Sequence, residues 1–499
     1  MKRIIYTAVM MSSLFISTSC VDLEQTPPSF ITEEEYLASM DLDALEKAVT
    51  ALYKDMWQGN YGFNARIQRI SVSADDITYS PTKANNTLDY YERLSPDLFA
   101  SGKDDSGTLW GAFYNVINNS NKLINKTVLP NDEKSAKEYQ KVLGEALFMR
   151  GLSYFYIVRL FGDAPLILKE EDAGKQMPRT SVSEIYEKAI VPSLEQACAW
   201  LPTTPRANNS STPSQWAAKA CLSDVYMTMA GWPLKKGTEY YAKAEVILKD
   251  IIDNSGLTLT GKYEDLWKEE LKNDINEHLF ALHHSAKQGG ASNYGKSYYP
   301  KDFYPKAGWA DYYAEEDFFL AYPEGERKEW NFMTEWDAGT KANHKITNYK
   351  ESVDGLPAIS KYYNYDNGAP GNSAQANGIT SIYRYADVLL MYAEASTKAT
   401  NSVSTMAAKA LKDVQERAKS SVITDTTDPA TFEKAVFDEN GWEFFAEMRR
   451  WFDLVRLEKV KDVKPEEWSS SLFNTHGHYY MPIPEEQISL TGWQNNSGY

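Results

Sequence analysis

The stretch EFFAEMRRWFDLVR, from Glu443 to Arg456, mixes large apolar side chains with charged ones. Its apolar residues step by four, three and four positions through Phe444, Met448, Trp451 and Val455. Such steps place side chains on one face of a helix. The spacing therefore predicts a continuous helix over 443–456 that is buried along this stripe.

The charges of the same stretch cancel. The acidic residues are Glu443, Glu447 and Asp453, and the basic residues are Arg449, Arg450 and Arg456. Because residues three or four apart are neighbours on a helix, we expect pairing along it, as between Glu447 and Arg450. This neutrality argues against a nucleic-acid interface, so we interpret the stretch as a scaffold helix.

Helical spacing extends outward over most of the chain. Leu45, Val49, Leu52 and Met56 predict a helix over Asp41–Trp57. The pattern returns around residues 109–124, 143–161, 181–194, 213–231, 238–253, 382–395 and 405–418. A chain with this many helical segments is expected to form an all-α fold.

Local signals mark the ends of two of these helices. Ser181 and Glu184 have the spacing of a capping box. Pro213 and Ser214 precede the next helix, and we expect Gly231 to end it in a left-handed conformation. Small residues cluster within that helix at Ala217, Ala218, Ala220 and Cys221. Antiparallel helix pairs with small residues at their contacts are tetratricopeptide-like.

Two long stretches, about 58–108 and 289–380, lack helical periodicity. The second is rich in Gly, Asn, Tyr and Pro, as in KYYNYDNGAPGNSAQANG. Long irregular segments within a large fold commonly carry function. We therefore predict a helical scaffold whose ligand site is formed by these two loop regions.

The composition limits the possible partners. The chain has 499 residues, with 52 Lys and Arg against 69 Asp and Glu, so its formal net charge is −17. That charge disfavours general binding to nucleic acid or to anionic lipid. Aromatic residues make up 13% of the chain, enough to fill a core or to offer flat faces to sugars.

The N-terminus has the layout of an export signal. Lys2 and Arg3 precede an apolar run that is too short to span a bilayer, followed by small residues and Cys20. We predict a lipoprotein signal peptide over 1–19 and acylation of Cys20, and an ordinary secretory signal is the alternative. Residues 20–40 are predicted to be a polar tether, and residues 41–499 the folded domain.

Cys198 and Cys221 lie in consecutive predicted helices. An exported protein can join two such cysteines in a disulfide. We favour two buried free thiols, and the disulfide stays open as the alternative.

Four segments together resemble the SusD/RagB family of surface glycan-binding lipoproteins. They are EALFMRGLSYFYIVRLFGDAPLIL (145–168), IYRYADVLLMYAEA (382–395), the opening stretch, and YYMPIPEEQISLTGWQNNSGY (479–499). The Asn276-Glu277 pair before a predicted strand also agrees. The chain departs from the family at Glu439-Asn440-Gly441, where Glu-Arg-Arg is common, so salt bridges carried over from the family are in doubt there.

The resemblance implies tetratricopeptide-like helix pairs in a right-handed superhelix, with a shallow ligand site on long loops. It implies no catalysis and no cofactor. It also implies a location in the outer membrane, with the lipid-anchored protein facing the cell exterior. The implied partner is a SusC-like TonB-dependent transporter to which the protein delivers a glycan.

No residue pattern indicates an enzyme or a metal site. The six histidines have no zinc-ligand spacing. Glu315, Glu316 and Asp317 are the nearest approach to a hydrolase cluster, but residues adjacent in sequence do not flank a glycosidic bond. Asn364, Asp366 and Asn367 lack the downstream glutamate of a calcium loop. A helical glycoside hydrolase or lyase stays as the alternative function, and a structural lid subunit that takes a peptide or no ligand as the second.

Sugar binding needs flat apolar faces with polar groups beside them. The candidate residues in the two loop regions are Trp309, Tyr298, Tyr299, Tyr304, Asp75, Asp76 and Tyr79. Trp309 is the first choice, because its small neighbours Gly308 and Ala310 leave its face accessible. Trp57 and Trp110 lie on apolar helix faces, so we expect them to pack in the core.

Overall fold

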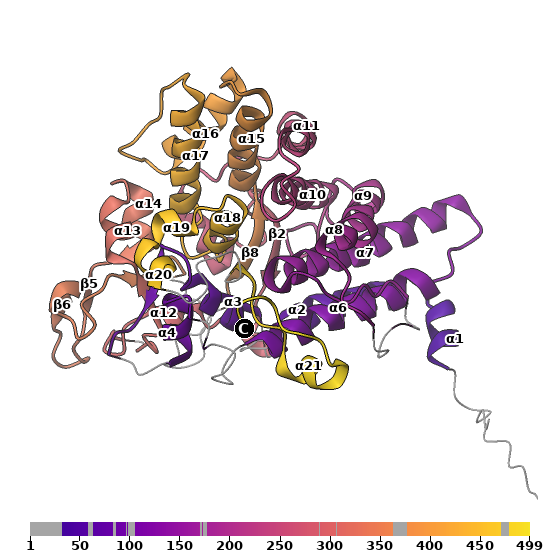
Figure 1. The fold of residues 1–499 in the computed structure, drawn as a ribbon, viewed down its shortest axis with the longest axis horizontal. Helices are drawn as coiled ribbons and strands as arrows, with labels where there is room; N and C mark the ends of the chain where they lie inside the picture. The colour runs from indigo at the N-terminus through magenta and orange to yellow at the C-terminus, as the bar shows by residue number, and fades with distance from the viewer. Residues whose placement is uncertain are drawn as a thin grey trace, which may run out of the picture.

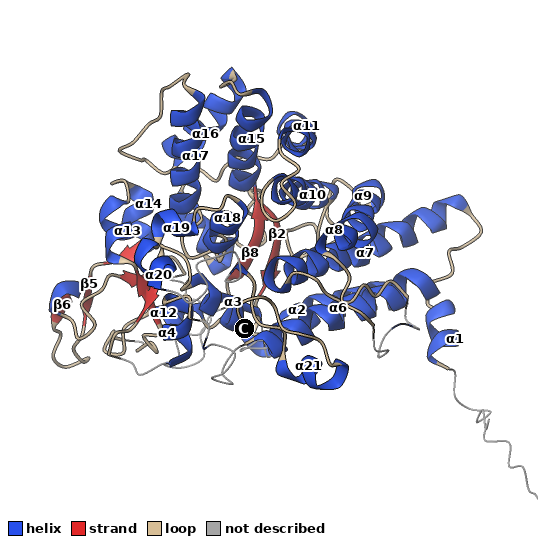
Figure 2. Cartoon of the chain, in the orientation of Figure 1, coloured by secondary structure: helices blue, strands red, loops and turns tan. Residues whose placement is uncertain are grey.

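A computed structural model describes residues 32–57, 63–82, 86–95, 97, 105–169, 172, 177–288, 290–305, 307–362, 377–470 and 479–499. Helices dominate the fold, and the strands are few and short (Figures 1 and 2). The longer helices form an arc through one side of the molecule, and many of the short helices and strands lie on the other side (Figure 1).

The arc is a continuous array in which each helix packs on its neighbours. In chain order the helices are α2 (Leu42–Trp57), α6 (Ser106–Lys126), α7 (Glu133–Phe161), α9 (Val191–Trp200), α10 (Gln215–Ala230), α11 (Thr238–Asn254), α15 (Tyr385–Thr400), α16 (Thr405–Arg417) and α17 (Pro429–Glu443). The apolar stripe of α2 is buried, as its spacing predicted. The all-α, tetratricopeptide-like fold class is confirmed.

The helix ends agree in part with the local signals. Ser181 caps α8 (Val182–Ile185), and Ser214 caps α10, each by accepting a backbone hydrogen bond. The prediction for Gly231 was wrong, because its φ is −93°. A Cβ at Gly231 would lie 2.3 Å from the carbonyl oxygen of Arg456, so glycine is needed there for close approach of two backbones.

The loop regions contain more regular structure than the sequence predicted. Region 58–108 holds α3 (Phe63–Ser71), α4 (Asn86–Glu92) and β1 (Ile77–Tyr79). Region 289–380 holds α12 (Tyr294–Tyr298), α13 (Glu316–Ala321), α14 (Glu326–Asn331), β3 (Tyr312–Ala314), β4 (Phe332–Met333), β5 (Glu335–Asp337), β6 (Ile346–Asn348) and β7 (Ala358–Ile359). These elements are short and are fixed by long-range pairing, which leaves no periodic signal in the sequence.

Antiparallel strand pairs connect distant parts of the chain, except for the local pair of β5 with β6. The pairs are β1 with β3, β4 with β7, β5 with β6, and β2 (His278–His283) with β8 (Ile379–Arg384). β2 begins directly after Asn276-Glu277, as predicted. The remaining short helices are α1 (Glu33–Ala38), α18 (Arg450–Arg456), α19 (Val460–Val463), α20 (Pro465–Ser470) and α21 (Glu485–Thr491).

The stretch 443–456 is not one helix, which corrects the prediction. Helix α17 ends at Glu443 and α18 begins at Arg450. Between them Ala446 and Met448 adopt left-handed conformations with φ of 60° and 63°. Backbone of this kind costs free energy and persists only where surrounding contacts fix it. Here Lys361 donates to the carbonyl oxygen of Phe445 at 2.7 Å, and Tyr362 donates to that of Ala446 at 3.1 Å.

Glu443 and Glu447 belong to a fully buried group of four cations and four carboxylates, which we call the central ion cluster. Its members are Glu277, Glu439, Glu443, Glu447, Arg327, Lys361, Arg384 and Arg417. The Arg384 guanidinium lies 2.5 Å from Glu443 and 2.8 Å from Glu447. Lys361 Nζ lies 2.6 Å from Glu447. Glu443 and Glu447 therefore pair with distant elements, whereas Asp453 and Arg456 pair along α18 at 2.8 Å.

Gly441 has a structural role in α17. A Cβ at this position would lie 2.8 Å from a guanidinium nitrogen of Arg450, which packs against the glycine. Arg450 in turn holds Asp75 of the first loop region at 2.7 and 2.8 Å. Glu439 beside it pairs with Arg327 at 2.5 Å. At this departure from the family sequence, the chain therefore forms its own set of ion pairs.

The predicted signal peptide and Cys20 lie outside the described residues. The predicted tether over 20–40 is described from Thr32 onward, and there α1 and the buried residues Leu37 and Met40 belong to the fold, which corrects this part of the prediction. No helix in the described part of the chain is long and apolar enough to cross a membrane. Cys198 and Cys221 are free thiols, as favoured from the sequence, but only Cys221 is buried and Cys198 is half-buried.

Candidate ligand-binding site

The two loop regions meet through backbone pairing. Tyr79 of β1 lies opposite Tyr312 of β3. Beside this pair, Asp354 accepts hydrogen bonds from Ser80 at 2.6 Å and from Tyr313 at 2.7 Å. The structure thus brings segments more than 200 residues apart into one surface.

Residues 297–311 form a closed loop that carries most of the predicted aromatic residues. Its base is tied by backbone bonds from Gly308 to Pro300 at 2.9 Å and from Ala310 to Tyr299 at 3.0 Å. A Cβ on Gly308 would lie 1.9 Å from the carbonyl oxygen of Tyr299. The glycine beside Trp309 is therefore required for the loop to close.

Tyr298 and Tyr299 lie inside this loop. Tyr298 is 1% exposed and stacks on Tyr362 with ring centroids 6.0 Å apart. Tyr299 is fully buried and meets Phe303 edge-on at 5.5 Å. Since neither ring reaches the surface, both residues pack the loop and offer no face to a sugar in this structure.

Trp309 and Tyr304 are half-buried and reach the surface of the loop. Lys296 Nζ lies 4.9 Å from the Trp309 ring centroid, so one face of the indole is already covered. The Tyr304 ring meets His344 edge-on at 5.6 Å. These two aromatic residues stay candidates for ligand contact.

The three candidates from the first loop region make internal contacts. Asp75 is held by Arg450, as described above. Asp76 is buried, and burial together with the charge of Asp75 raises its pKa to about 7. Tyr79 donates a hydrogen bond to Asp89 at 3.1 Å. We therefore interpret the two aspartates as structural residues of the loop.

A groove of about 640 Å³ lies beside α2 and the end of β2. Its lining residues are Lys47, Thr50, Ala51, Tyr53, Lys54, Trp57, Arg206, Ala207, Ser211, Thr212, Leu282, His283, His284, Ser285, Gln288 and Gly290. The volume falls within the range of about 300–1,000 Å³ that is typical of ligand pockets. Aromatic rings, hydroxyl groups and an amide line it together, which is the inventory that sugar binding needs.

The groove is built on a rigid base. The Trp57 ring packs against His284 with centroids 4.0 Å apart. Tyr53 donates a 2.5 Å hydrogen bond to Glu145, which also accepts from Arg206 at 2.7 Å. His283 Nε2 lies 2.9 Å from the Ser210 hydroxyl. A ligand entering here would meet side chains that are already ordered, which reduces the entropy cost of binding.

Sequence reasoning missed this groove because its walls come from three distant segments. Trp57 was assigned to the core, and it is only 5% exposed, yet its side chain also lines the groove. Trp110, with 6% exposure, packs against Phe161 and lies in the core as predicted. The position of Trp57 at the last turn of α2 was the one available signal, because a helix end adjoins a loop.

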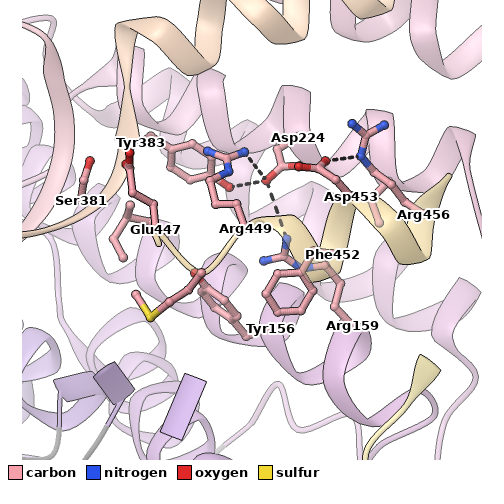
Figure 3. Close-up of a pocket in the computed structure, with 13 residues that line it drawn as sticks. Tyr156, Arg159, Asp224, Ser381, Tyr383, Glu447, Arg449, Phe452, Asp453 and Arg456 are labelled. Carbon is pink, nitrogen blue, oxygen red and sulfur yellow. Dashed lines mark hydrogen bonds and ion pairs between the residues drawn. The ribbon is translucent and has the colours of Figure 1, made fainter. Parts of the chain in front are cut away.

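A smaller pocket, shown in Figure 3, lies within the core at α18. Its volume is about 30 Å³, enough for water only. Asp224 accepts a 2.9 Å hydrogen bond from Tyr383 and lies 3.8 Å from Arg159 and 3.9 Å from Arg449 (Figure 3). These charges pair with one another, so we interpret this pocket as structural.

A third hollow, of about 510 Å³, contains the carboxylates that most resembled a hydrolase site. Glu315 and Asp317 line it, with Glu92 and Trp442. The charge of Glu92 helps to raise the pKa of Glu315, and Glu92 itself pairs with Lys464 at 2.7 Å. A carboxylate held by a lysine in this way is typical of a structural ion pair. In the described part of the chain, no group of acidic, histidine or cysteine side chains is arranged to hold a metal ion.

Replacing Glu315 by glutamine should change the pH dependence of stability. Burial, reinforced by Glu92, raises the pKa of Glu315 from 4.5 to about 8. Between pH 4.5 and about pH 8, the folded state therefore binds a proton at Glu315 that the unfolded state lacks. The stability that Glu315 contributes decreases as the pH rises through this range. Glutamine mimics the protonated carboxyl, so the variant should be more stable than the wild type at pH 8 by about 1–2 kcal/mol.

Thermal unfolding at pH 5 and at pH 8 would measure this effect. Glu316→Gln is the matched control, because Glu316 contacts the Tyr349 hydroxyl outside the pair. Equal pH dependence in Glu315→Gln and the wild type would contradict the raised pKa of Glu315.

Comparison with known proteins agrees with this architecture. A family model described as "SusD family" matches residues 333–499, and another described as "Starch-binding associating with outer membrane" matches residues 23–227. The chain belongs to the SusD/RagB family. A SusD-like protein P2 of Formosa agariphila is 25% identical over 97% of this SusD-like chain and 98% of its own. A SusD-like protein of Bacteroides ovatus is 26% identical over 89% of this chain and 80% of its own.

Solved structures share the fold of this SusD-like chain. A SusD superfamily protein from Parabacteroides distasonis superposes with a TM-score of 0.77 at 23% identity, covering 94% of this chain and 100% of its own. Surface glycan-binding protein A from Bacteroides thetaiotaomicron, solved in complex with laminarihexaose, has a TM-score of 0.72 at 17% identity, covering 92% and 99%. At these identities the likeness establishes the fold.

Proposed function

We propose that this SusD-like chain is a lipid-anchored outer-membrane protein that binds an oligosaccharide outside the cell. It passes the sugar to a SusC-like TonB-dependent transporter. The family model described as associating with the outer membrane supports the location, as does the lipoprotein layout around Cys20. Structural relatives described as laminarin binding and as bound to laminarihexaose support a glycan as the ligand. Binding and delivery require no covalent step.

The groove beside α2 is the observation that carries this proposal. It combines an indole and a phenol ring with hydroxyl groups from Thr50, Ser211 and Thr212. Rings stack on the C–H faces of a sugar, while hydroxyl and amide groups exchange hydrogen bonds with its hydroxyls. Trp309 and Tyr304 provide a second possible contact surface on the loop of residues 297–311.

Replacing Trp57 by leucine should weaken glycan binding by about ten-fold, because a central aromatic contact is lost. Isothermal titration against a glycan panel would measure the change. Trp110→Leu is the matched control, since it removes an indole of nearly equal burial from the core and should lower stability without changing affinity. Trp309→Ala tests the loop surface in the same assay. Equal loss of affinity in Trp57→Leu and Trp110→Leu would contradict a site in the groove.

Two rival functions have different outcomes. A glycoside hydrolase or lyase would release shorter products from a polysaccharide, and product formation would overturn the proposal. A structural lid subunit would co-purify with a transporter barrel but bind no glycan. The pairing of Glu92 with Lys464 beside Glu315 argues against the first rival, and the open groove argues against the second.

A further inference from the structure

The groove beside α2 has an unusual charge for this protein. Three cations, Lys47, Lys54 and Arg206, are among its lining residues, and none of the described lining residues is a carboxylate. The chain as a whole carries a formal charge of −17. By contrast, carboxylates such as Glu92, Glu315 and Asp438 line the hollow of about 510 Å³.

The three cations differ in how far they are neutralised. Arg206 is held by Glu145 at 2.7 Å and lies 3.6 Å from Glu46. Lys47 pairs with Asp43 one helical turn away, and both side chains are exposed. An exposed ion pair of this kind contributes little free energy, so Lys47 can readily exchange Asp43 for the anionic group of a ligand. Lys54 is exposed and has no ion pair within the described part of the chain.

A further cation lies behind the groove. Lys272 Nζ donates to the carbonyl oxygens of His284 and Asn377 at 3.0 and 2.6 Å. Burial and, to a smaller extent, the charge of Lys272 lower the pKa of His283 to about 3. The pKa of His284 is also lowered to about 3, so His283 and His284 are both neutral at pH 7. The electrostatic potential that Lys272 produces at these two rings is positive. Binding an anion in such a field is favourable.

We propose that the groove selects a saccharide that bears negative charge, as a carboxylate or a sulfate group. Lys54, with Lys47 beside it on α2, contacts the charged group. Trp57 and the hydroxyl groups of Thr50 and Thr212 hold the sugar ring. This inference rests on the proposed glycan binding and adds the chemical class of the ligand.

Titration with tetragalacturonate, with a sulfated tetrasaccharide and with neutral laminarihexaose tests the inference. The wild-type protein should bind one of the acidic sugars at least about ten-fold more tightly than laminarihexaose, and more weakly as the salt concentration rises. Lys54→Glu should weaken that binding by about ten-fold or more. Lys134→Glu makes the same charge change at an exposed lysine of α7 outside the groove, and should leave affinity unchanged.

Each result separates the inference from the function on which it rests. Preference for tetragalacturonate identifies the carboxylate as the recognised group, and preference for the other acidic sugar identifies the sulfate. If laminarihexaose binds as tightly as both acidic sugars, the groove does not select for charge and the inference is overturned. Glycan binding itself would then still stand. Equal effects of Lys54→Glu and Lys134→Glu place the acidic sugar outside the groove and overturn the inference. Absence of binding to any saccharide overturns glycan binding itself.

Discussion

Replacing Arg384 by methionine should lower the free energy of unfolding by about 3–5 kcal/mol, the range found when one partner of a buried ion pair is removed. Arg384 is fully buried and contacts Glu277, Glu443 and Glu447, so methionine would leave three buried carboxylates short of positive charge. Chemical denaturation followed by circular dichroism would measure the loss.

The control for this variant is Lys249→Met, which removes a cation from an exposed pair with Asp253. It should change stability by less than about 0.5 kcal/mol. Similar denaturation midpoints for Arg384→Met and Lys249→Met would contradict the role of the central ion cluster.

The cluster also predicts sensitivity to acid. Burial alone would raise the pKa of Glu443, but Arg417 and Arg384 hold it well below its usual value. The same balance, with Arg384 and Lys361, lowers the pKa of Glu447. Carboxylates with depressed pKa values stabilise the fold above the unfolded pKa of about 4.5, and this stability is lost as the pH falls further. The Arg384→Met variant should therefore lose less stability on acidification than the wild type does.

Replacing Trp451 by alanine is expected to have the second-largest effect. Trp451 is 6% exposed, at the start of α18, and its ring meets Tyr479 edge-on at 6.4 Å. Removal of a buried indole costs about 3–5 kcal/mol, because the cavity left behind is not refilled. The residue lines neither the groove nor the loop of residues 297–311, so glycan affinity should be unchanged in the protein that stays folded.

Denaturation and isothermal titration on the same preparation separate these two outcomes. A Trp451→Ala protein with wild-type stability and no glycan binding would mean that the stretch 443–456 belongs to the ligand site rather than to the scaffold.

The helical array could be predicted because its signals are local. The buried stripe of α2 and the caps at Ser181 and Ser214 depend on residues within a few positions of one another. Helices need only that short-range spacing to be recognised. The strands could not be predicted in the same way, since β1 finds its partner β3 more than 200 residues later.

The candidate site was predicted less well than the fold. Composition directed attention to aromatic loops, but it could not separate Tyr298 and Tyr299, which are buried, from Trp309 and Tyr304, which reach the surface. The groove at Trp57 was missed altogether. Exposure of a ring depends on which segments cover it, and that is a property of the assembled chain.

The sequence by itself determined the all-α scaffold and its family, because helix spacing and capping act over a few residues. Only the tertiary structure decided the role of the stretch EFFAEMRRWFDLVR. Its charges balance within the stretch, yet Glu443 and Glu447 pair with Arg384, Arg417 and Lys361 from distant elements. Those buried pairs hold the chain in left-handed turns at Ala446 and Met448 and end the helix that the spacing predicted. Burial makes a long-range ion pair strong enough to override a local preference for helix, and burial arises only when the whole chain has folded.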